Sequence, residues 1–158
     1  MDIVERIKTP RLYISLASNE EMEQVIAAES EPEMQKAYGE MLQGAIEHPD
    51  IREFYAMWRI GLRANPEVII GDVCFKGLDA QGRVEIGYGV YPQYEKNGYA
   101  TEAVKAMVNW AIKRPGVNCI EAEAEADNVA SLRVLEKCNF VPNGQTGEEG
   151  PRFVCMFN

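Results

Sequence analysis

The sequence is poor in the residues that build metal centres and histidine-dependent active sites. Its 158 residues include one histidine, His48, which has no patterned partner. The usual zinc signatures are therefore excluded, as is any Ser-His-Asp or Cys-His triad that uses another histidine. We expect His48 to have a loop or capping role. The four cysteines show no Cys-x-x-Cys spacing, and we predict buried free thiols of a reducing cytoplasm rather than disulfides or metal ligands. They are Cys74, Cys119, Cys138 and Cys155.

Positive charge is also scarce. The chain has 16 Lys and Arg against 25 Asp and Glu, a net charge of −9. Nucleic acids and anionic lipid surfaces both need basic patches, so we expect neither as a partner. No uncharged apolar run approaches the ~18–20 residues of a membrane span, and Met1 to Pro10 lacks the apolar segment of a signal peptide. We therefore expect a cytoplasmic protein, and the acidic balance suits an amine-bearing partner.

The length predicts one domain over residues 1–158, because single cores typically hold ~100–150 residues. Strand patterns at 11–16, 68–75, 84–91, 118–126 and 152–157 alternate with helical patterns. Residues 54–62 fit either a helix or a strand, and 144–150 read as a loop. Helices are predicted after Ser18 and Pro32, from Gly98 to Pro115, and from Asn128 to about Lys137. This order indicates an α/β sheet with some parallel pairing.

The most informative segment is a strand, a loop and a strong helix, from Val84 to Ile112. Free N–H groups and the dipole make a helix N-terminus an anion site, and Gly98 would let a phosphate approach the backbone. Gly87, Gly89 and Pro92 weaken a fully paired strand and favour a bulge or an edge there. Taken alone, this pattern is more typical of an ordinary strand–turn–helix connection than of an anion site.

A second segment follows thirty residues after Gly98, beginning at Asn128 and Ser131 and ending at Phe140. Together the two segments resemble the GNAT superfamily of N-acetyltransferases, nearest to the branch with the ribosomal-protein N-terminal acetyltransferases. The likeness is strong from Gly71 to Phe140. The residues that carry it are Glu85-Ile86-Gly87-Tyr88, Val90-Tyr91-Pro92, Lys96-Asn97-Gly98-Tyr99-Ala100-Thr101-Glu102-Ala103, Trp110 and the segment from Asn128 to Phe140.

The resemblance implies a fold and a cosubstrate. The fold would be a single-domain α+β structure whose mixed central sheet of about six to seven strands is flanked by helices. That sheet would be splayed between the strands at 84–91 and 118–126. The cosubstrate would be acetyl-CoA, with no metal. Its phosphates would meet the loop and helix start, and its pantetheine arm would meet the strand and the later motif. The implied binding residues are Tyr88, Val90, Lys96, Asn97, Gly98, Tyr99, Ala100, Asn128 and Ser131.

The chemistry requires a neutral amine, and alkylamines titrate near ~10, so a base or a proton relay is needed at pH 7. Glu85 is the candidate base, with a solvated strand residue as the alternative. The row Glu121, Glu123 and Glu125 is a second candidate for attracting the amine, although an exposed or paired strand face is favoured. Ser131 is the candidate partner of the departing thiolate, because the family's usual tyrosine position is Leu135 here.

Two functions follow. The first is an acetyl-CoA-dependent N-acetyltransferase that acts by direct attack in a ternary complex, with a small molecule or a protein N-terminus as acceptor. The second is a non-catalytic acyl-CoA-binding or sensor module, motivated by Leu135 and by Glu95 beside the expected phosphate site. Apolar residues in the N-terminal helices are compatible with a homodimer.

Overall fold

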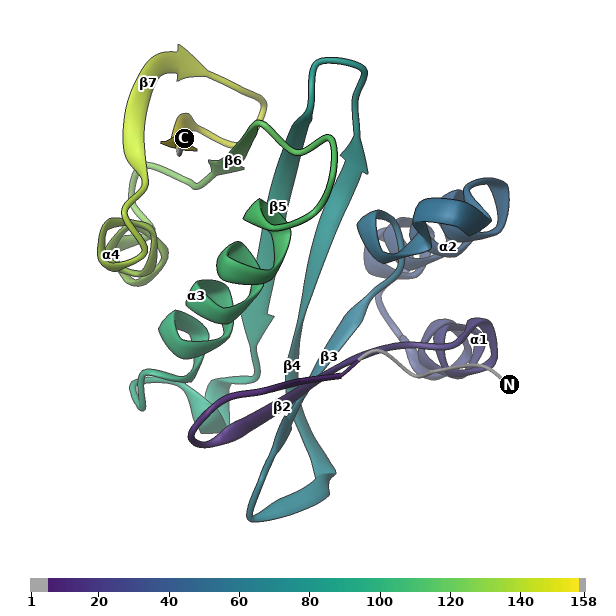
Figure 1. Cartoon of the computed structure of the whole chain (residues 1–158). Coiled ribbons are helices and arrows are strands. Elements are labelled where there is room, and N and C mark those ends of the chain that lie inside the picture. The colour runs from purple at the N-terminus through teal and green to yellow at the C-terminus, as the bar shows by residue number, and fades with distance from the viewer. Residues whose placement is uncertain (1–5, 157–158) are drawn as a thin grey trace.

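The computed structural model describes residues 6–156. One mixed sheet of eight strands has helices on both faces (Figure 1). Phe157 and the first residues of the segment considered for a signal peptide lie outside the described residues. In chain order the elements are β1 (Arg6–Lys8), β2 (Leu12–Leu16), α1 (Asn19–Ala28), α2 (Pro32–Glu47), the 3₁₀ turn η1 (Pro49–Phe54), β3 (Trp58–Leu62), β4 (Asn65–Leu78), β5 (Arg83–Val90), the 3₁₀ turn η2 (Pro92–Tyr94), α3 (Tyr99–Ile112), β6 (Cys119–Glu123), α4 (Val129–Lys137), β7 (Val141–Thr146) and β8 (Pro151–Met156).

The strand order is β1-β2-β3-β4-β5-β6-β8-β7, and only the β5–β6 pair is parallel. Helix α3 provides the crossover between these two strands, as parallel neighbours require. The fold class and the mixed sheet are confirmed, and the sheet has eight strands instead of six to seven. The two short edge strands account for the difference: β1 was not predicted, and β7 lies partly where a loop was expected.

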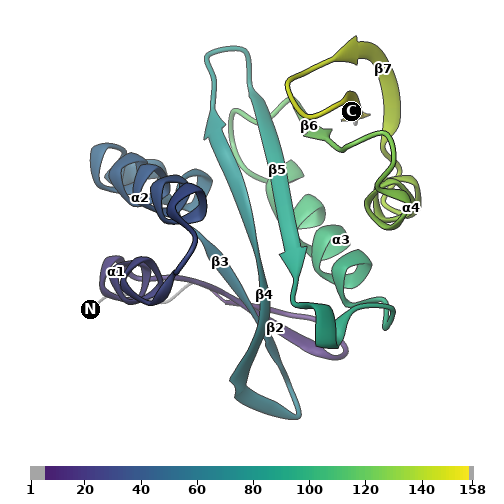
Figure 2. The same ribbon diagram turned by 180° about the vertical axis from the view of Figure 1, so that it is seen from behind.

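The two faces of the sheet carry helices of different origin. Helices α3 and α4 lie on one side and α1 and α2 on the other, which the reverse view shows as well (Figure 2). The main core lies under α3, where Trp110 packs with Phe54, Trp58 and Phe75 at ring-centroid distances of 5.1 to 5.8 Å. A smaller cluster that includes Met22 and Met57 holds α1 and α2 on the sheet.

Local sequence signals explain the helix boundaries. Ser18 and Glu21 form the reciprocal capping box that starts α1. Asn128 caps α4 by accepting from the Ser131 N–H at 3.1 Å. That helix ends at Lys137 and is followed by Asn139, whose φ of 67° is the left-handed conformation that Asn tolerates. His48 ends α2, stacks on Tyr55 at 4.1 Å, and so has the predicted capping role.

The cysteines behave as expected in the described part of the chain. Cys74, Cys138 and Cys155 are buried, Cys119 is half-buried, and all four are free thiols. Burial raises the pKa of Cys74 to about 12 and of Cys138 to about 11, so neither is a reactive thiolate. Across residues 6–156, the structure contains no helix that combines the length and the apolar character needed to cross a membrane.

Candidate active site

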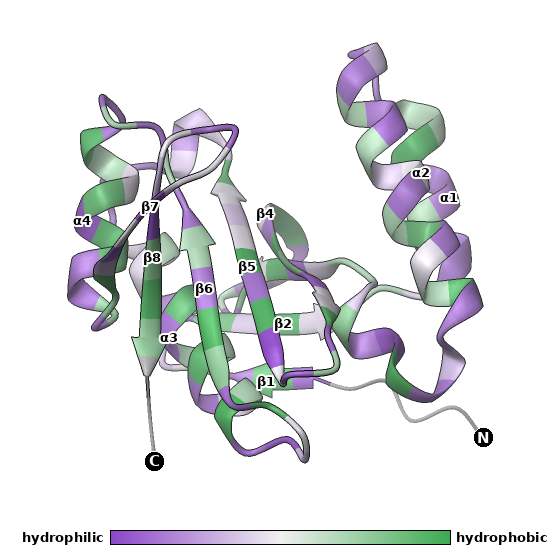
Figure 3. Cartoon of the chain, turned by 90° about the horizontal axis from the view of Figure 1, so that it is seen from above, coloured by the Kyte–Doolittle hydropathy of each residue, from purple (hydrophilic) through white to green (hydrophobic). Residues whose placement is uncertain are grey.

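Strand β5 is paired with β6 at only one end. Their parallel pairing covers Arg83 to Glu85, whereas β5 stays paired with β4 as far as Val90. The pairing stops at Glu85, and Figure 3 shows β6 lying between β5 and β8 in the sheet. The predicted splay between the strands at 84–91 and 118–126 is therefore present, and it leaves one edge of β5 free of backbone partners.

The free edge presents backbone N–H groups. Tyr91 donates its N–H to the Ile70 carbonyl at 2.8 Å, on the β4 side. Since N–H directions alternate along an antiparallel strand, the Val90 N–H points to the opposite, open edge. An unpaired strand edge of this kind can bind an extended ligand through main-chain hydrogen bonds.

A cavity of about 500 Å³ lies between this end of β5, the start of α3 and the first turns of α4. Most of the predicted binding residues line it: Tyr88, Val90, Lys96, Gly98, Tyr99, Ala100, Asn128 and Ser131. Asn97 and Glu85 are not among the lining residues. Sequence reasoning missed a further set, which includes Tyr94, Thr101, Arg133, Val134 and Lys137.

The end of the cavity at α3 is suited to an anion. Gly98 is the N-cap with φ of 79°, and it offers no side chain to occupy the free N–H groups of the first turn. Lys96, Arg133 and Lys137 line the same cavity, against one carboxylate, Glu95. Glu95 was expected to oppose a pyrophosphate, and these three cations outnumber it.

The loop before α3 is held by the N-terminal hairpin. The Arg11 guanidinium donates to the Asn97 carbonyl at 2.9 Å, pairs with Glu102 at 2.7 Å, and lies 4.4 Å from the Tyr99 ring centre. The Asn97 side chain in turn donates to the carbonyls of Tyr94 and Glu95. Asn97 therefore shapes the loop from outside the cavity, which differs from the direct binding role predicted for it.

A pair of hydroxyl groups lies in the cavity between β5 and α4. Tyr88 Oη on β5 lies 2.9 Å from Ser131 Oγ on α4. Burial raises the pKa of Tyr88, and the hydrogen bond with Ser131 opposes that shift only in part. Leu135, one turn further along α4, is buried in the core and takes no part in the cavity.

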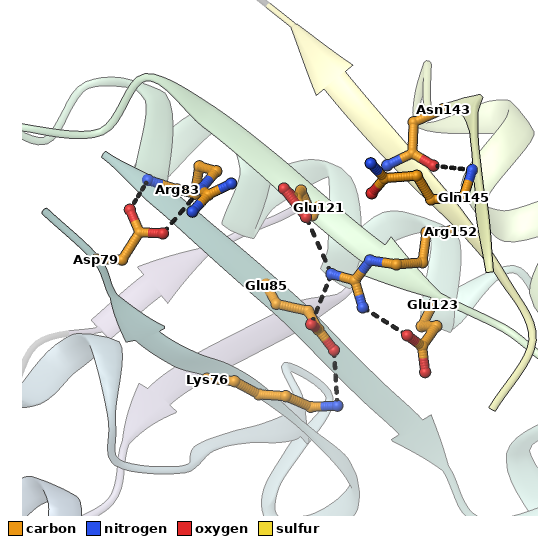
Figure 4. A network of polar contacts seen from close by, with 9 residues as sticks. All are labelled: Lys76, Asp79, Arg83, Glu85, Glu121, Glu123, Asn143, Gln145 and Arg152. Atoms are coloured by element: carbon orange, nitrogen blue, oxygen red, sulfur yellow. Dashed lines mark hydrogen bonds and ion pairs between the residues drawn. The ribbon is translucent and has the colours of Figure 1, made fainter. Parts of the chain in front are cut away.

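Glu85 lies at the paired end of β5, in an ion-pair network (Figure 4). Its carboxylate is 2.9 Å from the Lys76 ammonium and 2.9 Å from the Arg152 guanidinium. Arg152 also contacts Glu121 and Glu123, so this part of the acidic row is paired rather than turned toward an acceptor. Burial raises the pKa of Glu85, but the hydrogen bonds from Lys76 and Arg152 outweigh it, and the pKa falls below its ordinary value.

These contacts do not favour the base role predicted for Glu85. A carboxylate with a lowered pKa and two cationic partners is a weak proton acceptor. It also lines a different cavity, shared with Lys76, Glu121 and Arg152, and not the one that holds Ser131.

A carboxylate without such partners lies near the open end. Asp72 on β4 is opposite Gly89 of β5 and lines a second cavity of about 340 Å³ beneath α1 and α2. Burial raises its pKa to about 6, and the charge of Arg59 on β3 reduces the rise. Within the described part of the chain its carboxylate makes no hydrogen bond. Sequence reasoning missed Asp72, although one carboxylate in the apolar run 68–75 was a usable signal.

The two cavities are linked by one residue pair, because Asp72 lines the second cavity and its strand partner Gly89 lines the first. Val73 and Phe75 face the main core, so alternation along β4 turns Asp72 to the α1 and α2 side. Gly89 faces that side too, and a Cβ built on it would meet nothing within 4 Å. Strand β5 therefore has no side chain beside Asp72. At the same position, the other face of β5 and its open edge border the first cavity.

The comparisons with known proteins agree with this architecture. A family model described as an acetyltransferase (GNAT) domain matches residues 6–141. The uncharacterized N-acetyltransferase YoaA of Bacillus subtilis is 30% identical over 150 residues, which cover 87% of this chain and 84% of that protein. YjdG of the same species, also an uncharacterized N-acetyltransferase, is 34% identical over 91 residues, covering 58% of this chain and about half (54%) of that one.

Solved structures show the same fold. An acetyltransferase from Agrobacterium tumefaciens superposes with a TM-score of 0.75 at 16% identity, covering 99% of this chain and 97% of that one. The ribosomal-protein acetyltransferase RimL in complex with coenzyme A gives 0.74 at 16% identity, with 97% and 98% covered. With the splayed β5–β6 pair, the open helix N-terminus and the family model over most of its length, the chain belongs to the GNAT family of N-acetyltransferases.

Proposed function

We propose that this protein transfers an acetyl group from acetyl-CoA to a primary amine by direct attack in a ternary complex. The observation that carries the proposal is the position of the two cavities. The first has the open edge of β5, a helix N-terminus and three cations. The second holds Asp72, whose strand partner Gly89 lines the first cavity and carries no side chain.

The cation-lined cavity is the proposed acetyl-CoA site. Its phosphates would meet the free N–H groups of the first turn of α3 together with Lys96, Arg133 and Lys137. The pantetheine amides would pair with the open backbone edge from Tyr88 to Val90, and the Asn128 amide nitrogen remains available because its oxygen caps α4. The bound thioester supplies an activated acetyl carbon. This end of the strand is where an amine from the second cavity would meet it.

The second cavity is the proposed acceptor site, and Asp72 is the proposed base. Near pH 7 a carboxyl group with a pKa of about 6 is ionised yet more basic than an ordinary aspartate. The carboxylates of Glu21 and Glu29 line the same cavity and give it the acidic balance that suits an ammonium group, with Arg59 as the one cation among its lining residues. This proposal moves the base role from Glu85 to Asp72.

The amine attacks the thioester carbon, and the coenzyme leaves as a thiolate. The amine lone pair forms the N–C bond, the carbonyl oxygen becomes an oxyanion, and the Val90 N–H donates to that oxyanion. The oxyanion then collapses, the C–S bond breaks, and the sulfur takes the electron pair as a thiolate. The proton of the amine passes to Asp72, directly or through a water molecule.

Two measurements test the proposal. Calorimetry with acetyl-CoA should show binding to the unaltered protein, and an amine panel should produce free CoA thiol with at least one acceptor. The panel includes peptides with free N-termini and polyamines, since structural neighbours of this fold are described as a ribosomal-protein-serine acetyltransferase and a spermidine N-acetyltransferase. Absence of acetyl-CoA binding would overturn the proposal. Binding without thiol release from any amine would support the acyl-CoA-binding module instead.

A further inference from the structure

The hydroxyl pair in the cation-lined cavity joins two elements that are far apart in the sequence. Tyr88 on β5 and Ser131 in the first turn of α4 are 43 residues apart, with 2.9 Å between their hydroxyl oxygens. The phenol is also 3.2 Å from the Ser131 carbonyl oxygen. A tyrosine has one hydroxyl proton, so it donates to either the hydroxyl or the carbonyl at one time.

The contact is not needed to start the helix. Asn128 already accepts the Ser131 N–H and caps α4. A serine inside a helix commonly turns its hydroxyl back to a carbonyl three or four residues earlier. Here the hydroxyl instead lies against Tyr88, and both residues line the cavity. The tyrosine therefore determines where the serine hydroxyl points.

When Tyr88 donates to Ser131 Oγ, the serine proton is left to point into the cavity. Ser131 is the one hydroxyl-bearing residue of α4, and Leu135 offers none at the next turn. Any hydroxyl donor that α4 presents to a leaving group must then be Ser131.

The phenol is not itself a suitable proton source. Burial raises the pKa of Tyr88, so the phenol is a much weaker acid than a thiol, which titrates near ~8.5. Cys138, which also acts on Tyr88, has a pKa raised by burial to about 11. Both groups are protonated in the neutral range, and the pair can act by hydrogen bonding without ionising.

We propose that Tyr88 is a positioning residue that holds the Ser131 hydroxyl toward the thioester sulfur, so that Ser131 donates a hydrogen bond to the thiolate as the C–S bond breaks. The inference rests on the proposed acetyl transfer. No proton leaves either hydroxyl: the electron pair of the broken bond stays on sulfur, and Ser131 and Tyr88 share in its stabilisation through two linked hydrogen bonds.

The test is a double-mutant cycle with Tyr88→Phe, Ser131→Ala and the double variant. Each single change should lower kcat roughly ten-fold with less than about a two-fold change in calorimetric acetyl-CoA affinity, as loss of one transition-state hydrogen bond predicts. The double variant should be no slower than the slower single variant, because the two side chains act as a unit. Tyr13→Phe, which removes a phenol on the distant strand β2, is the matched control and should keep the unaltered kcat.

Three results would separate the possible failures. Losses that multiply in the double variant, or an unaltered kcat in Tyr88→Phe, would overturn the positioning role while leaving acetyl transfer intact. No turnover by the unaltered protein with any amine would overturn the acetyl transfer and the positioning role together.

If Tyr88→Phe does not fold, difluorotyrosine incorporated at Tyr88 keeps the shape of the side chain and lowers the pKa of its phenol. The proposal then predicts a new fall in kcat at alkaline pH, where the fluorinated phenol ionises and stops donating to Ser131. The same pH profile as the unaltered protein would overturn the positioning role.

Discussion

The two ends of strand β5 contrast in how their polar groups are partnered. At the paired end, the Glu85 carboxylate has one cation on each side, and Arg152 gathers carboxylates from β5 and β6. At the open end, the backbone edge has no strand partner, and the carboxylate of Asp72 on β4 makes no hydrogen bond in the described residues. Along the β4–β5 pair, the charges that stabilise the sheet therefore lie at one end and the unpartnered polar groups at the other.

The same chemical group behaves differently at the two ends. Glu85 and Asp72 are both partly buried carboxylates on neighbouring strands, yet the pKa of Glu85 lies below its ordinary value and that of Asp72 rises to about 6. Burial raises both, and only Glu85 has hydrogen-bonded cations to reverse the effect. The number of cationic partners, rather than burial, separates a structural carboxylate from a candidate base.

Exchange of the two carboxylates for amides gives the largest expected difference. Asp72→Asn should lower kcat/KM by about 100-fold, as removal of a general base does. In the unaltered protein kcat/KM should rise with pH around a midpoint near 6, because the amine can be deprotonated only when Asp72 is ionised. Initial rates of thiol release between pH 5 and 8 measure both.

Glu85→Gln is the matched control and should keep most of the activity. A large loss in Glu85→Gln together with an active Asp72→Asn would reverse the assignment of the two ends. The stability of Asp72→Asn gives a second check. The pKa of Asp72 is raised in the folded protein, so its contribution to stability is present at low pH and is lost as the pH rises through about 6. At pH 7 the uncharged amide of Asp72→Asn should therefore stabilise the fold, by up to about 3 kcal/mol.

Removal of the central cation tests the paired end. Arg152→Ala would leave Glu85, Glu121 and Glu123 facing one another with only Lys76 nearby, and we expect a loss of about 2 kcal/mol in the free energy of unfolding at pH 7. Urea unfolding measures this loss. The activity per folded molecule should change little, because the network lines another cavity.

The stability that the Glu85–Arg152 ion pair contributes should depend on pH. The pKa of Glu85 is lowered in the folded protein, so its stabilisation is present above its ordinary value of 4.5 and disappears as the pH falls through the folded value. The difference between Arg152→Ala and the unaltered protein should therefore shrink in acid. Arg83→Ala breaks an exposed pair with Asp79 and should cost much less, because exposed ion pairs contribute little to stability. Equal losses of stability in the two variants would contradict the stabilising role of Arg152 in this network.

The bare surface of β5 provides a steric test. Gly89→Leu would place a side chain between Asp72 and the thioester position, and we expect a loss of kcat/KM on the order of ten-fold with unchanged acetyl-CoA affinity. Gly89→Ala is the matched control, since its Cβ meets nothing within 4 Å. If Gly89→Leu were fully active, the amine would have to approach by another route.

The smallest expected effect concerns the cations of the open end. Arg133→Ala should weaken acetyl-CoA binding by about three- to ten-fold in calorimetry, and the loss should diminish at high salt because phosphate attraction is screened. Lys113→Ala, at the far end of α3, should leave the affinity unchanged. Equal effects of the two changes would indicate a general charge effect and no phosphate site.

Local chemistry was enough to predict much of the fold and part of the candidate site. The Ser18 cap, the left-handed Asn139 and the α3 start all depend on residues close in sequence. The splay was predicted through the resemblance, and most of the implied binding residues do line one cavity. Arg133 and Lys137 were missed, although they follow Ala130 at helical spacing and could have been read from it.

The remainder depends on contacts between distant segments. One of the two counter-ions of Glu85, Arg152, is 67 residues away, so the local sequence shows only part of the pairing that distinguishes that carboxylate from a base. Strand β7 includes Pro142, Asn143 and Gly144, which favour a turn, and it becomes a strand by pairing with β8. The environment of Asp72 likewise arises only when α1 and α2 cover β4.

The contacts of Arg11 with the loop before α3 and with Glu102 affect the order in which the chain folds. Arg11 reaches Asn97 across 86 residues of chain and Glu102 across 91, so these contacts close a large part of the polypeptide into one long loop. Contacts of such high sequence separation are slow to form. The proposed phosphate site of acetyl-CoA should therefore form late in folding, when the first hairpin docks, so that acetyl-CoA binding would report a completed domain.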